Sequence, residues 1–133
     1  MKKQKWPLLL LSLLIPLFIL AGCNSKPNLK GKWNVQSANH EYTTVEFTDK
    51  KVSVNGQEEE YKEVESGFKN NAHYIVIEMD GNPFTVVFPD IDKNVAVLIE
   101  PTSDDDYLVG TMLLAMNRKE TPNYDKYAKK YIK

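Results

Sequence analysis

The chain has one cysteine and two histidines, and this shortage limits its chemistry. With Cys23 as the single cysteine, the folded domain has no internal disulfide. His40 and His73 belong to no HExxH pair, and no Gly-x-Ser-x-Gly turn occurs. A carboxylate pair could cleave glycosides, but nothing selects one pair among the 18 acidic residues. We therefore expect a non-enzymatic protein without a cofactor.

The chain also has no more basic residues than acidic ones. The chain has 17 Lys and Arg against 18 Asp and Glu. Without residues 1–22, which contain three lysines, 14 basic residues remain and the net charge is about −4. Proteins that bind nucleic acid normally carry a basic patch, so we expect no nucleic-acid partner.

One stretch begins like a calcium-binding loop but lacks two of its essential residues. Asp90, Asp92 and Asn94 have the spacing of the first three ligands. The sixth position is Val95, where the sharp turn needs glycine, and the twelfth is Pro101, where a bidentate glutamate is needed. We interpret this stretch as an ordinary turn and predict no metal site.

The first 22 residues have the pattern of a secretory signal peptide. Three lysines precede an apolar stretch over residues 6–20, which is interrupted by two prolines. A spanning helix needs about 20 apolar residues, whereas a basic start, a shorter apolar region and small residues before a cleavage point are typical of a signal peptide. We predict that residues 1–22 are removed.

The end of this stretch indicates a lipid anchor. Residues 20–23, Leu-Ala-Gly-Cys, resemble the bacterial lipobox. The resemblance implies diacylglyceryl transfer to the sulfur of Cys23, cleavage before it, and anchoring on the extracytoplasmic face of the cell membrane. Asn24 differs from the aspartate typical of inner-membrane retention, which favours a Gram-positive host. An ordinary signal peptide and an uncleaved signal anchor are the alternatives.

Most of the chain after the anchor is predicted to form short strands. Residues 23–30 are polar, contain Pro27 and are expected to be a tether. In residues 31–119, alternating apolar residues and turn signals recur every 8–12 residues or so. Because the connections are short, they favour antiparallel neighbours, and we predict an all-β, up-and-down barrel of about eight strands. The expected strands are 31–37, 42–48, 51–55, 57–65, 73–79, 83–88, 94–100 and 107–117.

Residues 120–133 are predicted to form a short amphipathic helix. Thr121-Pro122 has the pattern of an N-cap followed by proline at the first helical position. Three tyrosines and an alanine follow on one helical face: Tyr124, Tyr127, Ala128 and Tyr131. We expect this face to pack on an apolar outer wall of the barrel, formed by Tyr74, Val76, Val87, Leu98 and Leu113. A helix on the membrane surface is the alternative.

The first expected strand opens with Gly31-Lys32-Trp33. This motif resembles the Gly-x-Trp that opens the first strand of lipocalins and related calycins. In that superfamily a basic residue at the end of the last strand packs across the tryptophan and closes the barrel floor. Arg118, or Lys119 as a substitute, occupies that place. The resemblance spans residues 31–133 and gives Gly31, Trp33 and Arg118 a structural role, since a guanidinium stacks well on an indole ring.

Two acidic runs are candidate partner-binding sites. Glu58, Glu59 and Glu60 follow the hairpin signal Asn55-Gly56, and Asp104, Asp105 and Asp106 follow the strand at 94–100. The first run could instead be a charged edge strand that blocks aggregation, and the second a solvated loop.

Three functions remain compatible with the sequence. The first is a membrane-anchored binding module for a small apolar ligand or, where side chains fill the barrel, for a peptide or protein. The second is an immunity lipoprotein that sequesters cationic peptides through the acidic hairpin. The third is an accessory subunit of an envelope complex.

Overall fold

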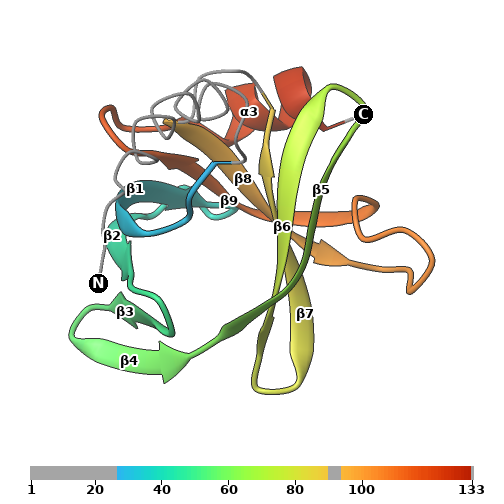
Figure 1. Ribbon diagram of the computed structural model, residues 1–133. Helices are drawn as coiled ribbons and strands as arrows, with labels where there is room; N and C mark the ends of the chain where they lie inside the picture. Colours follow the sequence, from blue (N-terminus) through green and yellow to red (C-terminus); the bar gives the residue numbers. More distant parts are fainter. Residues whose placement is uncertain (1–26, 90–93, 133) are drawn as a thin grey trace, which may run out of the picture.

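The computed structural model describes residues 27–89 and 94–132 (Figure 1). The expected signal peptide, Cys23, and Asp90 and Asp92 lie outside the described residues. Within these two ranges, no helix has the length and apolarity needed to cross a membrane. The described residues form nine strands and one helix: β1 Gly31–Ser37, β2 Tyr42–Phe47, β3 Lys51–Val54, β4 Gln57–Glu60, β5 Lys62–Lys69, β6 Ala72–Met79, β7 Asn82–Phe88, β8 Val95–Pro101, β9 Gly110–Asn117 and α3 Tyr124–Tyr131.

All nine strands belong to one antiparallel sheet. Its order is β4-β3-β2-β1-β9-β8-β7-β6-β5, so strands that follow each other in the chain are neighbours in the sheet, except at β4 and β5. Pairing of β1 with β9 joins the two ends of the domain. The predicted all-β, up-and-down architecture with a C-terminal helix is therefore confirmed, and Figure 1 shows the strands curving around a common interior with α3 outside.

The sheet has nine strands rather than eight, and it is not closed into a barrel. The expected strand 57–65 is divided at Tyr61 into β4, which pairs with β3, and β5, which pairs with β6. Tyr61 explains the division, because its side chain is only 8% exposed and its ring packs edge-on against Phe47 with centroids 5.5 Å apart. Turning this side chain inward bends the chain from one neighbour to the other, and β4 and β5 each keep an unpaired edge.

Two-residue turns set the register of three hairpins. Asn55-Gly56 joins β3 to β4, Asn70-Asn71 joins β5 to β6, and Asp80-Gly81 joins β6 to β7. All six residues have positive φ, between 52° and 84°, which is the conformation that type I′ hairpin turns require. The local sequence therefore determines where these strands pair.

The interior of the sheet is filled by side chains. Trp33, Ile77 and Val86 have no measurable exposure, and Phe88 and Ile75 are nearly as buried. The rings of Trp33 and Phe88 pack with centroids 6.1 Å apart. An eight- to nine-stranded antiparallel sheet has an interior that side chains can fill, and here they do so.

The helix α3 begins two residues later than expected. Its N-cap is Asn123, whose side chain accepts a hydrogen bond from the Lys126 backbone N–H at 2.9 Å. Pro122 is fully buried instead of being the first helical residue. The tyrosine face packs against the outside of the sheet, on a wall made of Val97, Ile99, Met112 and Ala115 with Val87 beside them.

The expectation about the outer wall is correct for Val87 and wrong for Leu98 and Leu113, which belong to the interior cluster. For Leu98 the reason is that β8 is apolar on both faces, so alternation did not decide which residues point inward. For Leu113 the reason is a register shift between β8 and β9. Leu98 pairs with Leu114 and Ile99 pairs with Met112, so Leu113 is an extra residue. Such a bulge moves the following side chains to the other face.

Candidate binding site

The structure brings Gly31, Trp33 and Arg118 together at one end of the sheet. The guanidinium carbon of Arg118 lies 4.0 Å from the centre of the Trp33 ring system. Nη1 of Arg118 donates to the Lys30 carbonyl at 2.7 Å, and Nη2 donates to the Asn28 carbonyl. The Trp33 indole N–H donates to the Leu29 carbonyl at 2.9 Å. This floor site, made of Gly31, Trp33 and Arg118, therefore holds residues 28–30 in place.

Gly31 is required at this floor site for two reasons. Its φ is +111°, which side chains rarely allow, and a Cβ built there would lie 2.9 Å from Nη1 of Arg118. Burial lowers the pKa of the Arg118 guanidinium from its ordinary value, yet arginine remains charged in proteins. The cation therefore stays available for the ring and both carbonyls, and its role is structural.

Residues 27–30, which sequence reasoning assigned to the tether, pack against the floor site. Leu29 is 5% exposed and belongs to the interior cluster. An extended chain advances at most about 3.6 Å per residue, so the four steps from Cys23 to Pro27 span no more than about 14 Å. A lipid on Cys23 would hold this end of the domain close to the membrane.

The two acidic runs do not form one site. Glu58, Glu59 and Glu60 lie on the exposed strand β4, and Glu58 pairs with Lys51 at 3.6 Å. Asp104, Asp105 and Asp106 lie in the connection between β8 and β9, on the opposite side of the molecule from β4 (Figure 1). Over residues 27–89 and 94–132, no group of three or more His, Cys, Asp or Glu side chains is arranged to hold a metal ion.

The aspartate run makes local contacts. Asp106 accepts the Leu108 backbone N–H at 2.9 Å and pairs with Lys69 at 3.5 Å. The loop also borders a hollow of about 160 Å³ with Tyr74, whose hydroxyl donates to Glu65 at 3.1 Å. The hydrogen bond to Glu65 and the burial of the ring raise the pKa of Tyr74.

A second hollow, of about 270 Å³, lies beside the floor site between Leu29, Tyr61 and Ile75. An ion pair of 2.8 Å between Lys30 and Asp49 lies at its edge. Lys30 lowers the pKa of the Asp49 carboxyl by a hydrogen bond and by its charge.

The largest of the three hollows described is a groove of about 490 Å³ beside the end of α3. We call it the C-terminal groove. Its floor contains Val87 and Ile99, and its walls contain Val109, Tyr131 and Ile132. Lys69 and Lys130 also line it. Small-molecule pockets are typically about 300–1,000 Å³, mostly apolar, with a few polar groups, and only this hollow of the three reaches that range.

The groove exists because α3 is too short for the wall on which it packs. A helix rises about 1.5 Å per residue, so the eight residues of α3 cover about 12 Å of the sheet. Beyond Tyr131, the floor of the C-terminal groove is bordered by the β5–β6 turn and by residues 108–110. Val109, at the wall, is 52% exposed, so an apolar surface remains open to a ligand.

Sequence reasoning named no residue of this groove as a site. The signals that pointed towards it were the tyrosine face of the helix and the apolar outer wall. Its remaining parts come from the β5–β6 turn and the end of the β8–β9 connection, whose meeting no local pattern indicates.

Comparison of this chain with protein-family models, curated proteins and solved structures finds no match.

Proposed function

We propose that this protein is a lipid-anchored, non-enzymatic binding protein on the extracytoplasmic face of the cell membrane, and that its C-terminal groove takes a small apolar ligand. The observation that carries the proposal is the groove itself, with its apolar floor and polar rim. The lipobox-like Leu-Ala-Gly-Cys segment supports the location.

The filled interior favours the groove over a lipocalin-like internal cavity. Five large side chains in the interior are at most 2% exposed: Trp33, Phe88, Ile75, Ile77 and Met116. Interiors packed in this way have few voids larger than a water molecule. The largest of the three described hollows lies outside the sheet, where Val87 and the half-exposed Val109 offer apolar surface to a ligand.

The test is native mass spectrometry on the chain from residue 24, purified from a bacterial lysate and compared with a stripped sample. This chain keeps every described contact, because these lie within residues 27–132. We expect a retained apolar mass that is lost on denaturation.

A matched pair of variants assigns the ligand to the groove. Val109→Asp should abolish retention, since it places a charge on the groove wall. Val64→Asp is the control, because Val64 is similarly exposed (49% against 52%) and lies on β5 outside the groove. Equal retention in both variants, or a bare mass in the unmodified chain, would refute the proposal.

A second candidate function is the capture of a cationic peptide. β4 and β5 are the two edge strands of the described sheet, and they carry five glutamates: Glu58, Glu59, Glu60, Glu63 and Glu65. An exposed edge can accept an extended peptide as an added strand, and these carboxylates would attract a basic one.

Charge reversal tests this second candidate. Replacing Glu58, Glu59 and Glu60 with lysine should remove tolerance of cationic peptides in a strain that depends on this protein. Lysine at Glu41, Glu46 and Glu120, which are also exposed, changes the net charge equally and should leave tolerance intact. The same loss of tolerance in both triple variants would indicate a general charge effect and reject the edge as the site.

A further inference from the structure

The rim of the C-terminal groove carries lysines, and no acidic side chain of the described residues lines it. Lys69, at the end of β5, approaches from the β5–β6 turn, and Lys130 approaches from α3. Two separate parts of the fold thus bring positive charge to the same apolar hollow.

The known contacts of these lysines are compatible with meeting an anion. Lys69 pairs with Asp106 at 3.5 Å, in a contact where both side chains are at least a third exposed. Such exposed pairs are weak. The ammonium of Lys130 lies 5.2 Å from the centre of the Tyr131 ring. An ammonium group has three donors and both side chains are exposed, so a ligand anion can share these donors with the partners already present.

We propose that the ligand of the C-terminal groove is an anionic single-chain amphiphile. This inference rests on the proposed function, namely that the groove is a ligand site. The apolar chain lies against Val87 and Val109, and the anionic head meets the ammonium groups of Lys69 and Lys130. Asp106, which pairs with Lys69 at 3.5 Å, competes with the head for that ammonium group, but the pair is exposed and therefore weak. Charges more than about 8–10 Å away are largely screened at physiological salt.

Three probes with the same ten-carbon chain test the charge preference: decanoate, decan-1-ol and decyltrimethylammonium. Isothermal titration calorimetry on the chain from residue 24, at low salt and below micelle formation, compares their affinities. An exposed charge pair contributes about 0.2–1 kcal/mol, so two lysines should favour decanoate over decan-1-ol by roughly 2- to 25-fold. The cationic probe should bind most weakly, and the preference should fall as salt rises.

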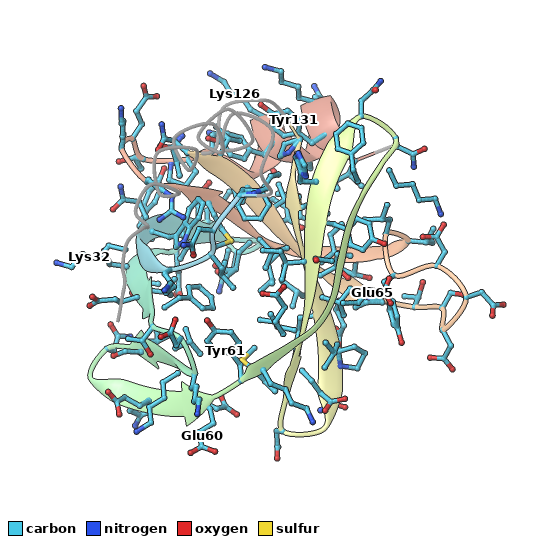
Figure 2. All side chains as sticks on the ribbon, viewed as in Figure 1. Lys32, Glu60, Tyr61, Glu65, Lys126 and Tyr131 are labelled. Carbon is cyan, nitrogen blue, oxygen red and sulfur yellow. The ribbon has the colours of Figure 1, made fainter. Side chains whose placement is uncertain are left out.

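Lysine variants test the contacts directly. Lys69→Met and Lys130→Met keep much of each apolar stem, and each should weaken decanoate binding by about 1.5- to 5-fold while leaving decan-1-ol unchanged. Lys62→Met is the control for Lys69, since Lys62 is also on β5 and pairs with Glu78 at 3.7 Å. Lys126→Met is the control for Lys130, because Lys126 lies earlier on α3, as labelled in Figure 2, and does not line the groove.

The outcomes separate this inference from the proposed function. If decan-1-ol binds as tightly as decanoate, or if the groove and control lysine variants behave alike, the anionic head is refuted. The groove would still stand if Val109→Asp weakened both ligands and Val64→Asp weakened neither. If no probe binds to the folded chain, both proposals fail. Circular dichroism of every variant confirms that the fold is retained.

Discussion

The floor site makes a prediction about how Gly31 and Arg118 depend on each other. Arg118→Ala removes a cation from the Trp33 ring, 4.0 Å away, and two hydrogen bonds to the carbonyls of Asn28 and Lys30. A partly desolvated cation–π contact is worth about 1–2 kcal/mol, and each hydrogen bond adds about 1 kcal/mol. We expect Arg118→Ala to lower the free energy of unfolding by about 3–4 kcal/mol.

Gly31→Ala should act partly through the same arginine. The positive φ of +111° would strain any side chain, at a cost of about 1–3 kcal/mol. The new Cβ would also displace Nη1 of Arg118, which lies 2.9 Å from its position. In the Arg118→Ala background only the strain remains, so the double variant should be less destabilised than the sum of the single variants by about 1–3 kcal/mol.

Urea unfolding of the chain from residue 24 measures these energies. The sequence has two tryptophans, Trp6 and Trp33, so this chain keeps only Trp33, at the floor site, as a fluorescent probe. Gly56→Ala is the control: Gly56 also has positive φ, at +84°, but its Cβ would meet nothing within 4 Å. Gly56 should show no coupling to Arg118. Additive effects of Gly31→Ala and Arg118→Ala, within about 0.5 kcal/mol, would refute the role assigned to the floor site.

Three further predictions follow from other parts of the molecule. Burial of the Tyr61 hydroxyl raises its pKa most, and the negative charges of Asp49 and Glu63 raise it further. The folded state therefore holds this proton more tightly than the unfolded state, and stability should fall as the pH rises above about 10. Urea unfolding of Tyr61→Phe should show a smaller fall over that range, and an unchanged pH profile would contradict this. Asn123→Ala should cost about 0.5–2 kcal/mol by removing the N-cap of α3, measured by thermal unfolding, whereas no change would mean that packing alone fixes the helix start. Cys23→Ala should abolish incorporation of labelled fatty acid in cells, and labelling that persists would contradict the lipid anchor.

The position of the acidic run shows where tertiary structure changes the meaning of a local pattern. In the sequence, Glu58–Glu60 belong to the second strand of a hairpin. In the structure, they lie on an edge strand that ends where Tyr61 turns inward (Figure 2). The inconsistent parity of Tyr61 and Val64 predicts a bulge or an edge, and both are present: the register shifts between Glu63 and Glu65, and β5 is an edge strand. This parity does not predict that β4 and β5 fail to pair with each other and leave the sheet open there.

The sequence by itself determined the strands and hairpins, because alternation of apolar residues and turns such as Asn55-Gly56 act between close neighbours in the chain. It also placed Trp33 and Arg118 at the ends of the first and last strands. Only the tertiary structure decided the floor contacts, the open sheet and the groove. Arg118 reaches carbonyls 88 and 90 residues away, and the groove forms where the β5–β6 turn, the β8–β9 connection and the end of α3 meet. These contacts depend on the curvature of the sheet, the bulge at Leu113 and the short length of α3, which together determine which distant segments share a surface.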